Sequence, residues 1–314
     1  MKKLPAFPSI IAIISLLLLS ASAHAGLFRA YVSSTGNDAN ACSLQAPCRL
    51  LPAALAAISD GGEIWMLDSA NYNTGPVNIA KSVTILAIPG MVGSVLAVNG
   101  PAVSITASGL SIALRNLAII PLTGGGGSYG VYMTGASTLT IENSLLANLP
   151  NHGVVVSGTG TVEIDNTTIR NNSGYALSLQ NGASADIHGT KMLNNSMGGI
   201  QAYSGASLNT TATVSDSLIS GGTEGVYAYA PTDGNGASRI FVTRSTIQKT
   251  AFALDSEANG TGSSLIAASN SMIVNNYCSY YQGGTGSPII RSLGNNHIAD
   301  NTTSFGSLTT TLLQ

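Results

Sequence analysis

Apolar and polar positions recur at fixed spacing through the middle of the chain. Three stretches read "IENSLLANL", "IDNTTIRNN" and "IHGTKMLNN", and they begin at Ile141, Ile164 and Ile187, 23 residues apart. Four further stretches share the pattern: "LRNLAIIPL" from Leu114, "VSDSLISGG" from Val214, "VTRSTIQKT" from Val242 and "ASNSMIVNN" from Ala268. Internal repetition at such a period is typical of solenoids and other repeat architectures.

Each column of this alignment has its own chemistry. The opening position is apolar, a small hydroxyl follows three residues later, and a second apolar residue comes two residues after that. The hydroxyl column holds Ser144, Thr167, Thr190, Ser217, Ser245 and Ser271, and a later column holds Asn148, Asn171, Asn194 and Asn275. Asn tolerates the left-handed backbone of tight corners, and its amide can bond to the next Asn along a stack.

The units are too short to bury an apolar face alone. The pattern therefore predicts coils of two or three short strands that stack with like residues above like, at the inter-strand spacing of ~4.8 Å. Ile164 and Ile169 are then core residues, and Asn166 and Asn171 lie at corners. A propeller blade needs longer repeats, no helical period is present, and an antiparallel sandwich does not require the same side chain in each column.

These columns, with the N-terminal segment "YVSSTGNDANACSLQAPCRLLPAALAAISDGGEIWML", resemble the right-handed parallel β-helix of the pectin-lyase-like superfamily. The resemblance implies an all-β fold with one domain, in which residues 26–80 form an N-terminal cap and first coil and residues 81–314 form the β-helix. A short helix from about Leu50 to Ser59, with Leu51, Leu55 and Ile58 at helical spacing, is expected to cover the open end.

Residues 1–25 have the pattern of a secretory signal peptide. Lys2 and Lys3 precede an apolar run from Ile10 to Leu19, and Ala23-His24-Ala25 is a small-x-small cleavage site. The run is too short to span a membrane comfortably, and no later segment is apolar enough to do so. We expect cleavage after Ala25 and export to the periplasm or beyond.

The content of charged residues limits the kinds of binding partner, and the cysteines indicate the compartment in which the protein resides. Only 8% of residues are charged, where ~25% is usual, and the formal net charge is −2. Without a basic stripe, a nucleic-acid partner is not expected. Cys42 and Cys48 are predicted to form a local disulfide, the alternative being two free thiols, and Cys278 is predicted to be a buried small apolar residue.

Five titratable residues are the candidate catalytic set. Alternation around the inward isoleucines points Glu142, Asp165 and His188 outward in one row, and Glu163 and Asp186 outward in the next. Carboxylates on adjacent strands can share a proton, act as general acid and nucleophile, or hold Ca²⁺, and His188 can act as acid or base. The alternative is a solvated face whose charges keep the protein soluble.

The catalytic motifs of the resembled family are incomplete here. Polygalacturonases carry Asn-Thr-Asp, Asp-Asp, Gly-His-Gly and Arg-Ile-Lys, whereas this chain has only "DNT" from Asp165 and "NHG" from Asn151. Its pectate lyases use Ca²⁺-binding acids with a basic residue, and the nearest expected cations here, Arg170 and Lys191, fall on the next strand around the coil. No zinc spacing or phosphate loop is present, so no cofactor other than Ca²⁺ is considered.

Two functions follow as hypotheses. The first is a non-catalytic extracellular or cell-surface protein that binds glycans along its flat face, to which tyrosines near the glycine-led strands would contribute by stacking on sugar rings. Those tyrosines are Tyr129, Tyr132, Tyr203, Tyr227, Tyr229, Tyr280 and Tyr281. The second is a polysaccharide lyase or glycoside hydrolase that uses the five titratable residues. We favour the first, because the catalytic motifs are incomplete.

Overall fold

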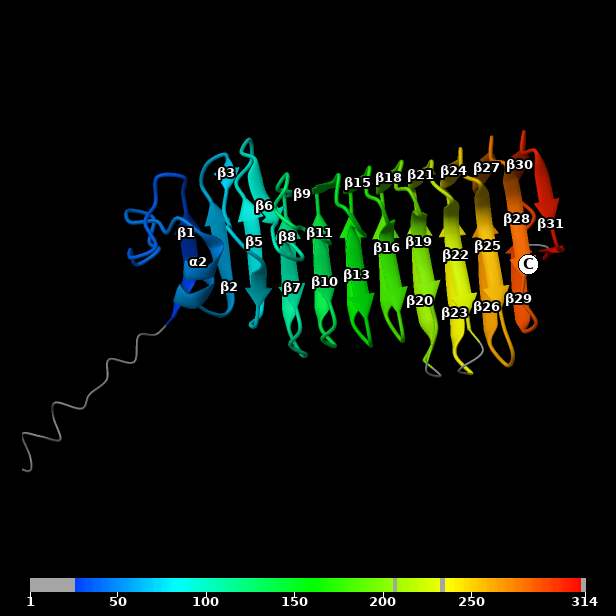
Figure 1. The fold of residues 1–314 in the computed structure, drawn as a ribbon, viewed down its shortest axis with the longest axis horizontal. Coiled ribbons are helices and arrows are strands. Elements are labelled where there is room, and N and C mark those ends of the chain that lie inside the picture. Colours follow the sequence, from blue (N-terminus) through cyan, green and yellow to red (C-terminus); the bar gives the residue numbers. More distant parts are fainter. Residues whose placement is uncertain (1–25, 206–207, 232–234, 312–314) are drawn as a thin grey trace, which may run out of the picture.

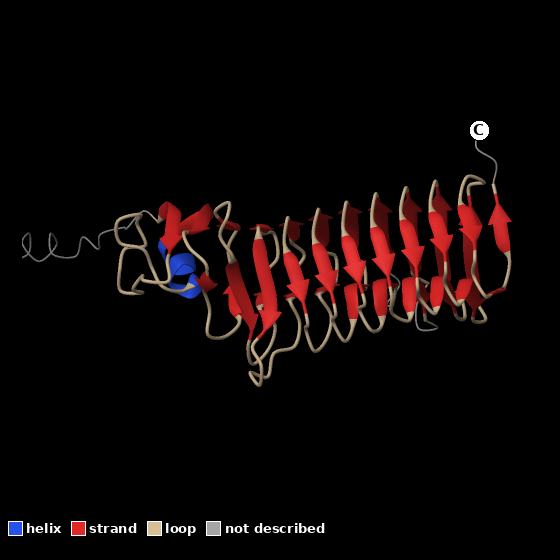
Figure 2. Ribbon diagram, turned by 90° about the horizontal axis from the view of Figure 1, so that it is seen from above, coloured by secondary structure: helices blue, strands red, loops and turns tan. Residues whose placement is uncertain are grey.

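The computed structural model describes residues 26–205, 208–231 and 235–311, and the predicted signal peptide lies outside these residues. The chain winds into three parallel sheets that follow one another around each coil, and the coils advance from the N-terminal to the C-terminal end (Figures 1 and 2). The predicted parallel β-helix is therefore confirmed. In the described part of the chain, no helix is long and apolar enough to cross a membrane.

We name the sheets A, B and C and give their strands in spatial order. Sheet A contains β1 (Leu27–Val32), β2 (Ile58–Met66), β5 (Val83–Ala87), β8 (Ser111–Arg115), β11 (Thr138–Glu142), β14 (Thr161–Asp165), β17 (Ser184–His188), β20 (Thr210–Ser215), β23 (Ala237–Thr243), β26 (Ser263–Ser269), β29 (Ser287–Ser292) and β32 (Leu308–Thr310). Sheet B contains β3 (Ala70–Asn71), β6 (Gly93–Ala97), β9 (Leu117–Pro121), β12 (Leu145–Ala147), β15 (Thr168–Arg170), β18 (Lys191–Leu193), β21 (Leu218–Ser220), β24 (Thr246–Gln248), β27 (Met272–Val274) and β30 (His297–Ala299). Sheet C contains β4 (Val77–Ile79), β7 (Val103–Ile105), β10 (Val131–Met133), β13 (Val154–Ser157), β16 (Tyr175–Gln180), β19 (Gly198–Tyr203), β22 (Glu224–Ala230), β25 (Phe252–Ala258), β28 (Cys278–Gly283) and β31 (Thr303–Phe305).

The core is a stack of apolar side chains in register from coil to coil. Ile141 pairs with Ile164, and Ile164 pairs with Ile187, in adjacent strands of sheet A. Their side chains are at most 1% exposed, as is that of Ile169 in sheet B. The apolar columns of the sequence are therefore the inward positions of the sheets.

The hydroxyl column forms a ladder at the corner between sheets A and B. The backbone N–H of Ser144 donates to Oγ1 of Thr167 at 3.2 Å, and the N–H of Thr190 donates to Oγ of Ser217 at 3.1 Å. Each hydroxyl also donates to the carbonyl two residues earlier, as Thr167 does to Asp165 at 2.9 Å. These side chains are buried, so the ladder satisfies backbone groups that turn away from the sheets.

Asparagines bond from coil to coil at the corner between sheets B and C, both in the predicted column, where the amide of Asn171 donates to Oδ1 of Asn148 at 3.4 Å, and in the column one residue later. Asn148, Asn171, Asn194 and Asn275 adopt the expected positive φ, between 52° and 60°. The buried amides belong to the next residues, Asn172, Asn195 and Asn276, which are 1–3% exposed. The first residue of each Asn-Asn pair supplies the backbone conformation, and the second supplies the buried hydrogen bonds.

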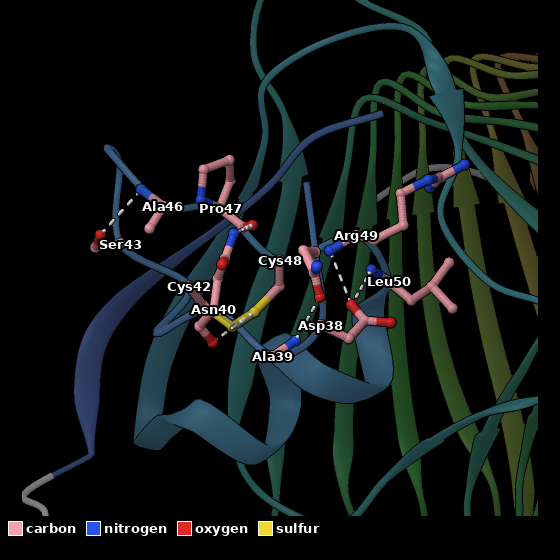
Figure 3. Close-up of a disulfide and its surroundings, with 11 residues drawn as sticks. Asp38, Ala39, Asn40, Cys42, Ser43, Ala46, Pro47, Cys48, Arg49 and Leu50 are labelled. Carbon is pink, nitrogen blue, oxygen red and sulfur yellow. Dashed lines mark hydrogen bonds between the residues drawn. A yellow bond between two sulfur atoms is a disulfide. The ribbon is translucent and has the colours of Figure 1, made fainter. Parts of the chain in front are cut away.

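The N-terminal segment contains the helix and the disulfide. Helix α2 covers Leu51–Ala57, shorter than predicted, because Ile58 already begins β2. It buries Leu51, Ala54 and Leu55 and contacts β1, β2 and β4. Cys42 and Cys48 form the predicted disulfide (Figure 3), with a Cα–Cα distance of 4.6 Å.

The chain around the disulfide is held to the start of α2 by one carboxylate. Asp38 Oδ1 accepts hydrogen bonds from the backbone N–H groups of Arg49 and Leu50, each at 2.8 Å (Figure 3).

Far along the chain, Cys278 is a free thiol that is fully buried, as predicted.

Candidate functional site

The predicted acidic rows lie side by side on the outer face of sheet A. Glu142 pairs with Asp165 and Asp165 pairs with His188, while Glu163 pairs with Asp186. These positions alternate with inward isoleucines, so the strand geometry alone places the five side chains on the outer face.

Four of the five candidates surround one shallow hollow. A hollow of about 170 Å³ is lined by Glu163, Asp165, Asp186 and His188, with Ile164 at its floor. All four polar side chains are exposed. Asp186 accepts a hydrogen bond from Thr213 Oγ1 at 2.7 Å, which holds that carboxylate beside the hollow.

Glu142 does not line this hollow, because an arginine holds it. Arg115 lies one strand before Glu142 in the same row, and its Nε is 2.8 Å from Glu142 Oε2. The expectation that the nearest cations are Arg170 and Lys191 is therefore wrong. Both of those residues do lie in sheet B, on β15 and β18.

His188 is oriented by a carboxylate that the sequence did not single out. Its Nδ1 is 3.3 Å from Oδ2 of Asp216, and Arg244 binds the same carboxylate through Nε at 2.9 Å and Nη2 at 2.6 Å. Arg244, as hydrogen-bond donor, lowers the pKa of Asp216, which keeps this carboxylate ionised. Nδ1 of His188 also lies 3.2 Å from Oγ of Ser215, so both Asp216 and Ser215 hold the ring from this side.

The hollow fits proton transfer or the binding of sugar hydroxyls more readily than metal binding. In the described residues, no group of three or more His, Cys, Asp or Glu is arranged so that it could hold a metal ion. Ca²⁺ requires six to eight oxygen ligands. Glu163, Asp165 and Asp186 therefore do not form a Ca²⁺ site by themselves.

A larger groove runs along the edge between sheets A and B. One part, of about 520 Å³, is lined by Met91, Val92, Asn116, Leu117, Ala118, Asn143, Ser144, Leu145, Asn166, Thr168 and Arg170. A second part, of about 440 Å³, is lined by Leu86, Ala87, Pro89, Gly90, Arg115, Asn116 and Asn143. The two hollows share Asn116 and Asn143, so they adjoin at the corner between the sheets, and we call them together the A/B groove.

Residues on the loop before β6 and at the corners line the A/B groove. Met91 and Val92 are 37% and 55% exposed, although both are apolar. The corner residues Asn143 and Asn166 have φ of 50° and 46°, and the amide of Asn166 donates to Oδ1 of Asn143 at 2.6 Å. The sequence indicated Asn166 as a corner residue but not Asn143 or the groove, because the loop that borders the groove lies before the regular repeats.

The tyrosines lie on another side of the molecule. Tyr129 stacks on Tyr132, and Tyr227 stacks on Tyr229, with ring centroids 5.2 and 5.6 Å apart. Tyr132, Tyr227 and Tyr229 belong to sheet C. Tyr280 pairs with the inward Leu254 and packs against the core, so it does not belong to the outer set.

Comparison with known proteins adds a family match. A family model described as "Right handed beta helix region" matches residues 129–303. None of the curated proteins matches the sequence. The match covers the regular coils, including the acidic hollow of sheet A.

Solved structures share the fold at low sequence identity. The XylC complex with xylose has a TM-score of 0.56 and 9% identity, over 84% of this chain and 71% of that chain. Pectate lyase Pel9A has a TM-score of 0.46 and 15% identity, over 89% and 79%. The catalytic unit of the thermostable GH87 α-1,3-glucanase from Streptomyces thermodiastaticus strain HF3-3 has a TM-score of 0.51 and 11% identity, over 81% of this chain and 49% of that chain.

Proposed function

Because the chain belongs to the right-handed β-helix family, we propose that it is an exported protein that binds a glycan along its outer face without cleaving it. The observation that carries the proposal is the A/B groove. Its amides, Thr168 and Arg170 can exchange hydrogen bonds with sugar hydroxyls, and exposed Met91 and Val92 can pack on apolar ring faces.

The ligand class is chosen by two further considerations. The two hollows of the groove are open and lie side by side, which suits a chain of sugar rings better than a compact cofactor. Two of the neighbours are, by their titles, a complex with xylose and an α-1,3-glucanase, and by analogy of fold this makes carbohydrate the class to test first.

A second function rests on a different observation. The hollow on sheet A brings Glu163, Asp165, Asp186 and His188 together, and Asp216 orients His188. This arrangement supports a glycoside hydrolase or polysaccharide lyase as the alternative. We place it second, because all four groups are exposed to water, where charge on a transition state is stabilised least.

One experiment separates the two functions. The mature protein is run through gels containing neutral or acidic polysaccharides, with and without Ca²⁺, while parallel reactions are assayed for new reducing ends and for ultraviolet absorbance of unsaturated products. We expect retarded migration without products. Arg170→Gln should weaken retention about tenfold, whereas Lys191→Gln, on the next strand of sheet B, should not.

Other results would contradict the binding function, the catalytic function or both. Products that disappear in Asp165→Asn or Glu163→Gln would establish the enzyme and overturn the binding protein. No retention on any polysaccharide, together with no products, would overturn both. Retention that Arg170→Gln leaves unchanged would place the binding surface outside the A/B groove.

Export and end-capping are part of the same proposal. The signal-peptide pattern of residues 1–25 and the Cys42–Cys48 disulfide support an oxidising compartment. Sequencing of the protein recovered from outside the cytoplasm should begin at Gly26. Helix α2, which lies at the N-terminal end beside β1 and β2 (Figure 1), is proposed to shield the first coil from solvent.

A further inference from the structure

A group of carboxylates and tyrosines occupies the outer face of sheet C, away from the A/B groove. Asp255 in β25 lies between Tyr227 of β22 and Tyr281 of β28 in one row across the strands. Glu257 is two residues further along β25, on the same face, and pairs with Tyr229. Glu224 begins β22. We call Glu224, Tyr227, Asp255, Glu257 and Tyr281 the sheet C cluster.

Two of its carboxylates are held by tyrosine hydroxyls. Tyr227 donates to Oε2 of Glu257 at 2.9 Å, and Tyr175 of β16 donates to Oε2 of Glu224 at 3.1 Å. Because these hydroxyls are neutral donors, they leave the negative charge of the cluster in place.

Asp255 differs from its neighbours in having a buried oxygen without a partner. The residue is 5% exposed, and its Oδ1 is one of two buried side-chain polar atoms that lack a hydrogen bond among the described residues. Burial, followed by the charges of Glu257 and Glu224, raises the pKa of Asp255 to about 8. A buried polar group without a partner is costly, and such groups in folded proteins often mark a functional site.

No cation offsets this charge in the described part of the chain. The ion pairs found there join Arg29 to Glu63, Arg115 to Glu142, and His188 and Arg244 to Asp216, and none includes a carboxylate of the sheet C cluster. A fold in which only 8% of residues are charged has nevertheless placed three acids close enough for their charges to interact.

We propose that the sheet C cluster binds an organic ammonium group. Carboxylates accept charge-assisted hydrogen bonds from an ammonium N–H and attract a quaternary ammonium by charge alone, while tyrosine ring faces attract cations and pack on attached carbon atoms. Tyr227, Glu257 and Tyr281 are half-buried, so part of each side chain faces solvent beside Asp255. These residues do not form a group that could hold a metal ion.

Binding is linked to the proton on Asp255. A cation beside this carboxyl favours its ionised form, so the ligand should release a proton from Asp255 below pH 8. The other titratable groups that face it are Glu224 and Tyr227 on β22, Glu257 on β25, Tyr281 and Cys278 on β28, and Tyr175 on β16. Burial also raises the pKa of Glu224, so Glu224 adds a smaller contribution of the same sign.

The ammonium group can belong to a free amine or to an amino sugar, and the experiment distinguishes these sources. The mature protein is titrated calorimetrically with choline, whose charge is permanent, and with glucosamine, glucose and N-acetylglucosamine. We expect choline or glucosamine to bind and the two uncharged sugars not to bind. Stronger binding of glucosamine than of choline would identify an amino sugar, and the reverse order a free quaternary amine.

Variants connect binding to the cluster. Glu257→Gln should weaken choline binding at least tenfold, whereas Asp300→Asn, which removes one charge at a corner of sheet B, should not. In the wild type the affinity for choline should rise from pH 6 to pH 9 with proton release, and in Asp255→Asn most of this pH dependence should be lost. Thermal unfolding of each variant verifies that it is folded.

Three results would overturn the proposal. The first is that no ammonium ligand binds saturably at millimolar concentration. The second is that folded Glu257→Gln and Asp255→Asn proteins bind choline with wild-type affinity. The third is that CaCl₂ binds and choline does not. Because the cluster lies on sheet C, loss of glycan retention in Arg170→Gln bears only on the A/B groove, so the two proposals fail independently.

Discussion

Oδ1 of Asn195 accepts two hydrogen bonds from Asn172 one coil earlier, from the backbone N–H at 3.2 Å and from the side-chain amide at 2.9 Å. The amide of Asn195 in turn donates to the carbonyl of Ile169 at 3.0 Å. One side chain thus satisfies three buried groups of the preceding coil. Such a residue contributes to stability mainly through what its removal would leave unpaired.

Replacement of Asn195 by Ala should therefore be strongly destabilising. Leaving the two donors of Asn172 and one carbonyl without partners should lower the free energy of unfolding by about 2–4 kcal/mol. Urea denaturation followed by circular dichroism measures this change. The control is Asn194→Gly, because Asn194 is exposed and has φ of 52°, a conformation that glycine adopts readily. Equal effects of both substitutions would contradict the assignment of the buried ladder.

A charge at the core position of β15 should prevent folding. Ile169 is fully buried in the apolar stack, so Ile169→Asp places an unpaired carboxylate where water cannot reach it. The soluble yield and the far-ultraviolet spectrum of the protein report the outcome. Thr168→Asp, on the outward side of the same strand, should remain folded. A soluble, folded Ile169→Asp protein would show that the stack tolerates charge.

The disulfide should contribute measurable stability despite its short loop. Cys42 and Cys48 are six residues apart, and constraining so small a loop in the unfolded chain is worth about 2 kcal/mol. The Cys42→Ser, Cys48→Ser double variant should unfold at correspondingly lower denaturant concentration, and adding reductant to the wild type should reproduce the shift. The thiol of Cys278 should stay unreactive until unfolding, because it is buried. Identical midpoints with and without reductant would refute the prediction.

Stability should fall as pH rises, through the titration of Asp255. Its pKa is raised from 3.8 to about 8, so the folded protein holds a proton that the unfolded chain has lost between those values. Asp255 therefore contributes stability that is complete below pH 4 and is lost as pH approaches 8, with a slope of up to about 1.4 kcal/mol per pH unit. Unfolding free energies at pH 5, 6 and 7 for the wild type and Asp255→Asn test this.

Comparison with Asp255→Asn is essential, because another group acts in the opposite sense. Burial lowers the pKa of His152, so its contribution to stability increases as pH rises through its unfolded value near 6.5. The difference between wild type and Asp255→Asn cancels this term. A difference that does not change with pH would show that Asp255 titrates as an ordinary exposed acid.

The columns of the sequence were sufficient to predict the coils, their register and the outward acidic rows. Register follows from identical chemistry at each turn, so Ile141, Ile164 and Ile187 could be aligned without a structure. The same reasoning found the stacked asparagines of the corner but missed the buried ladder one residue later. Both residues of an Asn-Asn pair are identical in type. The sequence therefore does not show which one turns the backbone and which one makes the buried side-chain hydrogen bonds.

The partners of the acidic residues were harder to foresee. Arg115 follows Leu114 as Glu142 follows Ile141, so the aligned columns already place it in the row of Glu142, and the pair was overlooked. Asp216 and Arg244 occupy the corner column that Asn143 and Asn166 fill elsewhere, and both have positive φ. The sequence analysis assigned these two residues no role, whereas the corner directs Asp216 toward both Arg244 and His188.

The sheet C cluster was missed for a related reason. Its tyrosines attracted attention as stacking surfaces, while Glu224, Asp255 and Glu257 are spread over two coils and form no motif along the chain. Only the pairing of β22 with β25 brings them together. Asp255 is buried on an outward face between Tyr227 and Tyr281 of the neighbouring strands, an arrangement that local sequence does not encode.

The hydroxyl ladder between sheets A and B has a consequence for how this protein can change in length. Each rung joins a backbone amide to a hydroxyl exactly one coil away, and from Ser144 to Thr190 the spacing is a constant 23 residues. If one whole repeat were deleted or duplicated there, each backbone amide would meet an equivalent hydroxyl on the next coil, and the ladder would stay continuous. Insertion of a single residue would instead move the corner hydroxyl out of register with the backbone amide of the neighbouring coil. We therefore expect the β-helix to tolerate the loss or gain of a whole repeat in this region, but not of a single residue.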